Sequence, residues 1–238
     1  MSLINEIIAL PNVDKDHFKD QWYEGRNHGD LVHPFKLVAS GPPNSGKTTS
    51  IINIFMRIQL SDKPFENLIV IQPETNQEYN ILDPTIILND FPQPEDLVCG
   101  ADDEMLKTAI IIDDIDLSKL TKVQQLNISK LFRYLSSHSN ISVFCSYQSF
   151  FSIPILIRNC CSHFLVYKPR NIDELNTISR RVGINKDSFN NIFEREITGR
   201  RDCLLIDLSC PIELMLRKNI FQVLNINDYK KIKYSKKV

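Results

Sequence analysis

The most constraining feature of the chain is a glycine-containing segment of eight residues that joins two hydrophobic segments: Gly41, Pro42, Pro43, Asn44, Ser45, Gly46, Lys47 and Thr48. Residues 35–40 before it have the composition of a buried strand. Residues 49–60 after it predict a helix, because Ile51 and Phe55 recur at helical spacing. The segment fits G-x-x-x-x-G-K-[ST], and a strand, a turn and a helix are the context in which this pattern binds nucleotide phosphates.

The residue types within the segment indicate what each would do. The glycines allow the backbone to curl so that successive N–H groups point at one anion. Lys47 can reach the β- and γ-phosphate oxygens, and the Thr48 hydroxyl can bind Mg²⁺. We therefore expect residues 41–48, together with Thr49 in the first helical turn, to bind ATP with Mg²⁺.

A second candidate element is a hydrophobic run that ends in two carboxylates, Ile110-Ile111-Ile112-Asp113-Asp114. At the carboxyl end of a buried strand, Asp113 would face the phosphate loop and hold Mg²⁺. Asp114 would then polarise the attacking water as a general base. The alternative is that both aspartates only cap the following helix.

Two further residues are candidates for hydrolysis. Gln148 follows the strand expected at 141–145 and is our candidate to orient water beside the γ-phosphate, with a surface amide at a strand end as the alternative. Ring-forming ATPases complete each site with an arginine from a neighbouring subunit. Arg158 is our first candidate for this role, and a surface salt bridge is its alternative. The other candidates are Arg133, Arg170, Arg180 and Arg181.

Composition limits the classes of function. The 238 residues suffice for one α/β domain, and a net charge of −1 gives no global basic field. Residues 74–104 are acidic, and the end of the chain, 230–237, is a basic tail that is either solvated or touches phosphate. No signal peptide or membrane span is expected, and the six scattered cysteines are expected to be reduced rather than paired or zinc-bound.

Strands alternating with helices predict parallel β-α-β units. Residues 72–107 are expected to be a long proline- and acid-rich segment with a helix near 94–97. Strands are expected at residues 35–40, 67–71, 108–112, 141–145, 163–167, 203–208 and 214–221, and helices at 49–60, 119–137, 152–158, 172–182 and 186–197. The helix at 119–137 is expected to face the core with Leu120, Val123, Leu126, Ile128, Leu131 and Leu135.

Four motifs together resemble the genome-packaging ATPases of large DNA viruses and virophages, in the FtsK–HerA branch of P-loop motors. They are G-P-P-N-S-G-K-T at 41–48, I-I-I-D-D at 110–114, F-C-S-Y-Q at 144–148 and I-R-N at 157–159, and they span about residues 33–170. The resemblance implies that Lys47 and Thr48 bind nucleotide and Mg²⁺, Asp113 is the Walker B acid, Asp114 the catalytic acid and Gln148 the sensor. Many members carry Glu where this chain has Asp114, whose side chain is one methylene shorter.

We therefore expect an α/β fold, a RecA-like P-loop NTPase with a central, mostly parallel sheet flanked by helices and a C-terminal extension of helices and a strand pair. The whole chain, 1–238, is expected to be one ATPase domain, with a lead-in at 1–32, a core at 33–170 and an extension at 171–238. The expected function is an ATP-driven motor that moves double-stranded DNA into a viral capsid. Its expected partners are duplex DNA, further copies of itself in a ring of five or six subunits, and a capsid protein. Its expected location is the host cytoplasm or the virion.

Two other functions remain open from the sequence. A P-loop kinase for nucleosides or nucleotides would need a lid bearing arginines, which Arg180-Arg181 or Arg200-Arg201 can supply. A non-catalytic assembly protein would bind ATP without turnover. The sequence does not identify the residues that contact adenine, although His33 and Phe35 beside the first strand are candidates.

Overall fold

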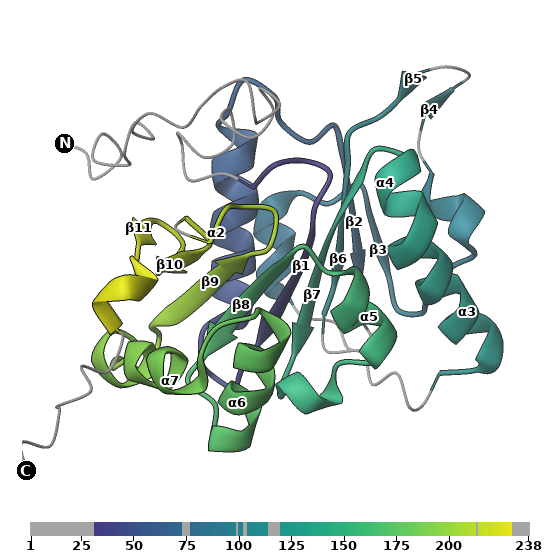
Figure 1. Cartoon of the computed structure of the whole chain (residues 1–238). Helices are drawn as coiled ribbons and strands as arrows, with labels where there is room; N and C mark the ends of the chain where they lie inside the picture. The colour runs from purple at the N-terminus through teal and green to yellow at the C-terminus, as the bar shows by residue number, and fades with distance from the viewer. Residues whose placement is uncertain are drawn as a thin grey trace, which may run out of the picture.

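The structure is a computed structural model that describes residues 31–72, 77–98, 100–101, 104–113, 120–212 and 214–229. Its centre is a nine-stranded sheet with the order β11-β10-β9-β8-β1-β7-β6-β2-β3 (Figure 1). The strands are β1 (Lys36–Ser40), β2 (Asn67–Ile71), β3 (Ile86–Leu88), β6 (Thr108–Ile112), β7 (Ile141–Tyr147), β8 (His163–Tyr167), β9 (Cys203–Asp207), β10 (Leu216–Lys218) and β11 (Gln222–Val223). A separate two-stranded ribbon pairs β4 (Gly100–Ala101) with β5 (Glu104–Met105).

The strands from β8 to β3 in this order run parallel, and β9, β10 and β11 continue the sheet as an antiparallel edge. Every residue of β2, β6, β7 and β8 is buried, which explains why these strands are hydrophobic throughout rather than alternating. The predicted α/β class, the parallel β-α-β units and the C-terminal strand pair are confirmed.

Helices cover both faces of the sheet, as Figure 1 shows. The α-helices are α2 (Lys47–Gln59), α3 (Lys122–Lys130), α4 (Ser136–His138), α5 (Ile155–Cys160), α6 (Ile172–Arg181) and α7 (Lys186–Arg195). The 3₁₀ turns are η3 (Gln77–Leu82), η4 (Pro94–Leu97), η6 (Phe150–Ser152) and η7 (Ile226–Tyr229), and η5 (Leu131–Leu135) is a π-helical turn. One hydrophobic cluster joins α2 and η3 to one face, and a second joins the buried residues of α3, η5, α5, α6 and α7 to the other.

The helix expected at 119–137 is built differently from the prediction. The helix α3 begins at Lys122 with a capping box between Thr121 and Gln124, and continues into the π-helical turn η5. Val123 and Leu126, both expected in the core, are 56% and 63% exposed. Ile128 and Leu131 lie on the buried face, and Leu126 and Val123, which come two and five residues before Ile128, lie on the other side of a helix with 3.6 residues per turn.

The segment between β2 and β6 contains more structure than the sequence indicated. The 3₁₀ turn η4 lies where a helix was expected near 94–97. The edge strand β3 and the turn η3 were not predicted, because neither has a periodic hydrophobic pattern of its own. Through η3 and β3 this segment packs against α2 and β2.

The two adenine candidates lie at the wrong end of β1. His33 and Phe35 precede the amino end of this strand, while the phosphate loop follows its carboxyl end, about 16 Å away for five residues. Phe35 is buried against Phe144, and the His33 ring contacts Ser142 and Asn140. Neither side chain can contact a nucleotide held at the phosphate loop.

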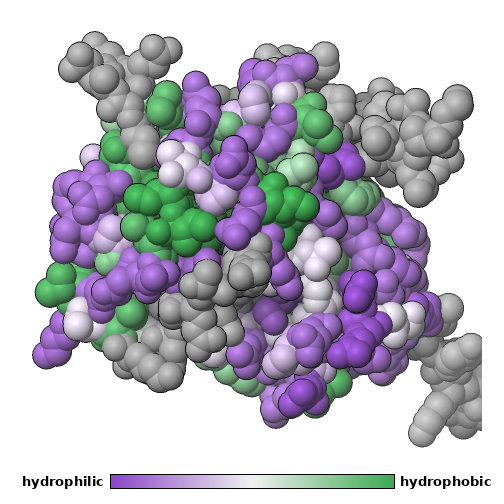
Figure 2. All heavy atoms as spheres, turned by 180° about the vertical axis from the view of Figure 1, so that it is seen from behind, coloured by the Kyte–Doolittle hydropathy of each residue, from purple (hydrophilic) through white to green (hydrophobic). Residues whose placement is uncertain are grey.

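Several expectations concern residues outside the described part: residues 1–30 of the lead-in predicted at 1–32, the catalytic Asp114 and the basic tail at 230–237. Within the described residues, five cysteines are free thiols, and no helix is long and apolar enough to cross a membrane. Seen from behind, the molecule shows hydrophobic side chains gathered in patches on a largely hydrophilic surface (Figure 2). α2 and η3 bear exposed apolar side chains, among them Met56 and Ile81.

Candidate functional site at the carboxyl edge of the sheet

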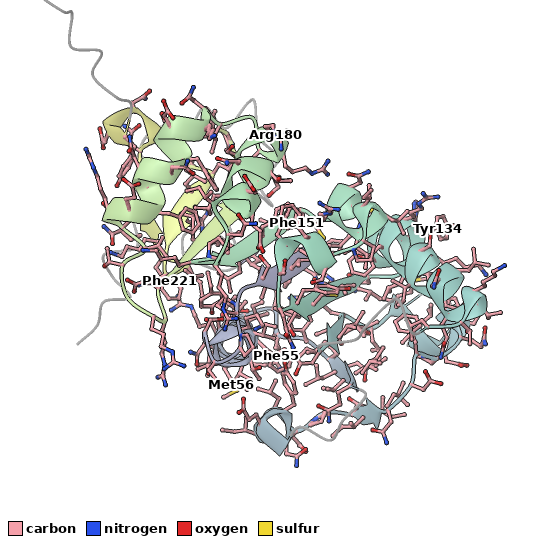
Figure 3. All side chains as sticks on the ribbon, turned by 90° about the horizontal axis from the view of Figure 1, so that it is seen from below. Phe55, Met56, Tyr134, Phe151, Arg180 and Phe221 are labelled. Carbon is pink, nitrogen blue, oxygen red and sulfur yellow. The ribbon has the colours of Figure 1, made fainter. Side chains whose placement is uncertain are left out.

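The alternation of side chains brings polar groups together at the carboxyl edge of the sheet. In β6, Ala109 and Ile111 face α2, so Asp113 two residues later faces α2 as well. Ser146 in β7 lies on the same face by the same alternation, two residues after Phe144. Figure 3 views this edge along the strands, with α2, marked by Phe55 and Met56, on one side and η5, marked by Tyr134, on the other.

The phosphate loop takes the shape that its residue types predict. Asn44 and Gly46 have φ angles of 61° and 104°, in the left-handed region that glycine adopts without strain and asparagine tolerates. Only glycine fits at position 41, because a Cβ atom there would lie 2.6 Å from the Tyr167 Cβ at the end of β8. The Tyr167 hydroxyl donates to the Gly46 carbonyl at 2.9 Å and lies 2.6 Å from the Ser50 hydroxyl. The tyrosine thus supports the loop at both of its glycines.

The N-terminus of α2 is suited to an anion. Gly46 caps the helix without any side-chain hydrogen bond, and no acidic residue lies in the first turn. The first N–H groups of a helix have no intrahelical acceptors and carry the positive end of the helix dipole. Thr48 is half-buried and Thr49 exposed at this position. The arrangement is that of a phosphate site.

The Lys47 ammonium folds back over the loop. It donates hydrogen bonds to the carbonyl oxygens of Gly41 at 2.9 Å and Pro42 at 3.2 Å. These contacts hold the charge above the concave side of the loop, at the position from which it can bind phosphate oxygens.

Asp113 lies at the end of β6 and is buried. Its carboxylate accepts a hydrogen bond from the Ser146 hydroxyl of the neighbouring strand β7. Together with the Thr48 hydroxyl, it forms a set of hard oxygen donors, the ligand type that Mg²⁺ prefers. The residues present therefore fit a magnesium site, and the assignment of Thr48 and Asp113 as its ligands stays a prediction.

A tyrosine that the sequence did not single out lies near this group. Tyr79 of η3 is 0% exposed and packs in the hydrophobic cluster that includes Ile51 and Phe55 of α2. Its buried hydroxyl has no hydrogen-bond partner among the described residues. Burial, with a smaller contribution from the Asp113 charge, raises the pKa of the Tyr79 phenol, so it stays protonated at physiological pH.

Gln72 is a further polar residue at the carboxyl edge of the sheet, beside Asp113. Ile71 of β2 pairs with Ile112 of β6, so Gln72 and Asp113 are the next neighbours along these two strands. Gln72 is 1% exposed, yet neither its amide nitrogen nor its amide oxygen has a hydrogen-bond partner among the described residues. Such a group costs free energy on folding, so its presence at this edge suggests a use in function.

Gln148 lies beside the start of the phosphate loop. The Gly41 N–H donates to the Tyr147 carbonyl at 3.1 Å, which makes the exposed Gln148 the direct neighbour of the loop. The strand that carries it, β7, lies between β1 and β6. The structure therefore brings Lys47 at the start of α2, Asp113 after β6 and Gln148 after β7 to one edge of the sheet.

Arg158 lies on the opposite face of the sheet from α2. It belongs to α5, whose Ile157 packs into the second hydrophobic cluster, and its guanidinium carbon is 5.3 Å from the Phe150 ring centroid. Arg181 donates to the Arg158 carbonyl at 2.8 Å. Burial, together with the charge of Arg181, lowers the pKa of Arg158. Within the described residues neither guanidinium forms an ion pair, and Arg158 does not join Lys47 and Asp113 in one site.

Sequence reasoning missed Ser146, Tyr167, Gln72 and Tyr79 as parts of the site. Ser146 and Gln72 could have been identified from the sequence. Each is a polar residue at the end of a buried strand, an even number of residues from the strand residues that face α2. Tyr167 is the last residue of an apolar strand and has the pattern of a core residue. Tyr79 has no local signal, since only the packing of η3 against α2 brings it to the site.

Comparison of the sequence with protein-family models and with curated proteins finds no match. Comparison of the structure with solved structures finds the genome-packaging NTPase B204 of Sulfolobus turreted icosahedral virus 2, in complex with ATP-gammaS, at a TM-score of 0.54 and 14% identity, over 79% of this chain and 98% of that one. B204 of Sulfolobus turreted icosahedral virus, a DNA-packaging ATPase, matches at 0.54 and 15% identity, over 78% and 96%. The pCW3 conjugation coupling protein TcpA with ATPgS matches at 0.53 and 10% identity, over 84% and 62%.

These solved structures share 10–15% sequence identity with the chain. At such identities they establish the fold, and the resemblance that the motifs indicated is confirmed at that level. The chain therefore has the RecA-like P-loop NTPase fold of its structural neighbours, among which are the viral genome-packaging NTPases.

Proposed function

We propose that this chain is an ATP-hydrolysing motor that moves double-stranded DNA, and that its task is to package a viral genome into a capsid. The observation that carries the proposal is the meeting of three groups at one sheet edge: a phosphate loop with Lys47 held above it, the buried carboxylate of Asp113, and Gln148 beside Gly41. A phosphate cradle alone can bind nucleotide. The added acid and amide are what hydrolysis requires.

Each residue has a role that follows from its position. The N–H groups of the loop and the Lys47 ammonium bind the phosphates. Thr48 and Asp113 would hold Mg²⁺, which when bound neutralises charge on the β- and γ-phosphate oxygens. Gln148 orients the attacking water, and Asp114, by the resemblance, accepts its proton.

The assignment to DNA rests on the structural neighbours. B204 is named as a genome-packaging NTPase, and the present fold covers 98% of that chain. TcpA is named as a conjugation coupling protein. The shared fold supports a DNA motor over the other P-loop functions. We propose that the protein works with a capsid protein as partner, in the host cytoplasm or in the virion.

We further propose that the motor is a homo-oligomeric ring of five or six subunits in which Arg158 serves the nucleotide of a neighbour. Arg158 lies on α5, on the sheet face opposite α2, and its guanidinium carbon is 5.3 Å from the Phe150 ring centroid. An arginine with no carboxylate partner among the described residues supports such a role, because it can bind a phosphate from outside.

The test is phosphate release by purified protein with and without linear duplex DNA, at several salt concentrations. We expect DNA to stimulate hydrolysis without sequence preference, and binding to weaken as salt rises, since contacts would go to the phosphate backbone. Transfer of phosphate to added nucleosides would instead indicate a kinase. Tight ATP binding without turnover, even with DNA, would indicate a nucleotide-gated assembly protein.

A further inference from the structure

An arginine of the C-terminal extension lies beside the phosphate loop. The Arg201 Cγ would lie 3.9 Å from a Cβ atom at Gly46, and the other atoms nearest to that point belong to the Tyr167 ring and hydroxyl. We propose that Arg201 binds the α-phosphate of the nucleotide held by the loop. The proposal rests on the function proposed above and goes beyond it, since none of the four motifs includes this arginine.

A closed turn presents Arg201 to the loop. The Asp202 N–H donates to the Gly199 carbonyl at 3.1 Å, so residues 199–202 form a β-turn with Arg200 and Arg201 at its two central positions. The Asp202 carboxylate accepts from the Gly199 N–H at 2.7 Å and from the Asn219 amide at 3.2 Å. The backbone of the turn is therefore fixed without any contribution from the arginine side chains.

The Arg201 guanidinium is available to an anion. The side chain is exposed, and among the described residues it has no hydrogen bond or ion pair. The neighbouring Asp202 carboxylate is bonded within the turn instead. A guanidinium keeps its charge at all physiological pH values and forms strong hydrogen bonds to phosphate oxygens. Beside the N–H groups at the start of α2, it adds a side-chain cation to a site that already favours anions.

The place of Arg201 along the sheet edge indicates which phosphate it serves. Strand β1, which leads into the loop, lies between β7 and β8. Gln148 after β7 and Asp113 after β6 lie on one side of the loop, and the turn 199–202 lies on the other, because it leads into β9, the partner of β8. Hydrolysis requires the γ-phosphate on the side of Asp113. The α-phosphate then lies on the side of Arg201.

The experiment measures binding of fluorescent ADP and of a fluorescent, non-hydrolysable ATP analogue to the parent protein and to Arg201→Ala. We expect both affinities to fall by the same factor, about 10-fold, because both ligands carry an α-phosphate and each loses a charge-assisted hydrogen bond. Arg201→Lys should recover part of the loss, since it keeps the positive charge. Arg200→Ala is the matched control from the same turn, and its affinities should stay within about twofold of the parent.

A second measurement locates the contact on the nucleotide. The two diastereomers of an ATP analogue with sulfur on the α-phosphate differ in which oxygen is replaced, so an arginine bonded to one oxygen distinguishes them. The ratio of their affinities should therefore change between the parent and Arg201→Ala. An unchanged ratio would contradict a contact with the α-phosphate.

The outcomes separate this inference from the proposed function. Unchanged affinities in Arg201→Ala protein with the parental melting temperature overturn the inference and leave the ATPase proposal intact. A loss for the ATP analogue alone would place the guanidinium at the γ-phosphate, and no recovery in Arg201→Lys would indicate stacking on the base; either result overturns the inference. An equal loss in Arg200→Ala would do so too, since it would indicate a general effect of positive charge. A parent protein that binds neither nucleotide overturns the proposed function and this inference with it.

Discussion

The Lys47 ammonium donates a hydrogen bond to the Gly41 carbonyl oxygen over 2.9 Å, and so joins the last part of the phosphate loop to its first residue. The contact holds the loop in a curled form around the place where a phosphate would bind. A phosphate would offer the ammonium a charged acceptor in place of two carbonyls. Lys47 therefore has both a structural contact and a binding role, and the two can be separated experimentally.

Lys47→Ala is expected to abolish hydrolysis and to weaken ATP binding, because it removes the positive charge facing the phosphates. The melting temperature without nucleotide should fall only slightly, since the hydrogen bonds of this ammonium go to carbonyls of a partly exposed loop. Lys36→Ala is the matched control. That lysine begins β1 at the opposite edge of the sheet and donates to Ser137 on the surface. Hydrolysis by the Lys47 variant at the parental rate would refute the assignment of the loop.

Asp113→Asn and Asp114→Asn are both expected to reduce ATP hydrolysis, but for different reasons. Asp113→Asn should still accept a hydrogen bond from Ser146 but lose charge at the site that would hold Mg²⁺, so hydrolysis should require far more Mg²⁺. Asp114→Asn should bind Mg²⁺ and ATP normally and turn over about 10²–10⁴ times more slowly, as expected for loss of a general base. Titration of the hydrolysis rate with Mg²⁺ distinguishes the two. Normal turnover by the Asp114 variant would place the base elsewhere.

The strands and the phosphate loop could be predicted because their signals are local. Hydrophobic runs such as 108–112 are buried on both faces, and the spacing from Gly41 to Thr48 defines the turn without help from the rest of the chain. The contribution of Tyr79 could not be predicted, because it depends on how a segment without periodicity folds back onto α2. The prediction of the buried face of α3 failed for another reason: hydrophobic residues occur on more than one side of this helix, so the sequence pattern alone did not show which side is buried.

Gln72→Leu is expected to stabilise the protein while reducing its activity. The Gln72 amide is buried without partners among the described residues, and an unsatisfied buried polar group costs about 1–3 kcal/mol. Leucine of similar size removes that cost, so the unfolding free energy from urea denaturation should rise by about 1–2 kcal/mol. The rate of hydrolysis should fall, since the amide lies next to Asp113 at the carboxyl edge. A less stable variant would show that the amide has a bonding partner in solution.

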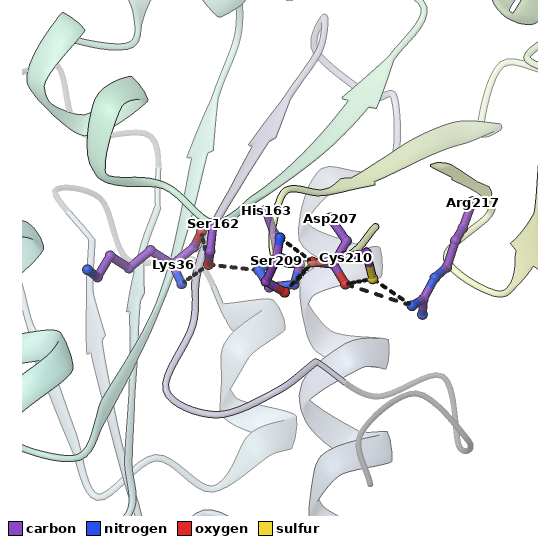
Figure 4. Close-up of polar contacts among 7 residues, drawn as sticks. All are labelled: Lys36, Ser162, His163, Asp207, Ser209, Cys210 and Arg217. Atoms are coloured by element: carbon purple, nitrogen blue, oxygen red, sulfur yellow. Dashed lines mark hydrogen bonds and ion pairs between the residues drawn. The ribbon is translucent and has the colours of Figure 1, made fainter. Parts of the chain in front are cut away.

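Asp207 is expected to be the most sensitive position of the C-terminal extension. It is buried and holds three elements together: its Oδ1 lies 3.2 Å from His163 Nε2 of β8 and accepts from the Ser209 N–H, and its Oδ2 lies 3.8 Å from Arg217 of β10 (Figure 4). Asp207→Ala leaves the Arg217 charge buried, which typically costs about 3–5 kcal/mol of unfolding free energy.

The matched control for Asp207 is on the same hairpin. Lys218→Ala removes an ion pair of 3.5 Å to Glu196 that is partly exposed, so its cost should stay within about 1 kcal/mol. Denaturant unfolding of both variants measures the difference. Equal effects would mean that the buried cluster adds no more than a surface pair.

The final prediction concerns Arg158 and the subunit that it serves. Arg158→Ala should retain ATP binding and lose hydrolysis, by up to about 10³–10⁵ if it acts as an arginine finger. Arg180→Ala is the control, because that arginine is exposed on α6 and donates within its own helix. The activity of the parent protein should also rise more than linearly with concentration as rings form.

Mixing two inactive variants tests whether Arg158 acts between subunits. A ring that contains both Arg158→Ala and Asp114→Asn subunits has some interfaces where an intact Asp114 on one subunit meets an intact Arg158 on the next. Those interfaces should hydrolyse ATP, so the mixture should recover part of the parental rate although each variant alone is inactive. Residues that act within one subunit cannot be rescued in this way, because every subunit of the mixture still lacks one of them. No recovery in rings that demonstrably contain both variants would exclude Arg158 as the residue supplied to the neighbour, and Arg133 would be tested next.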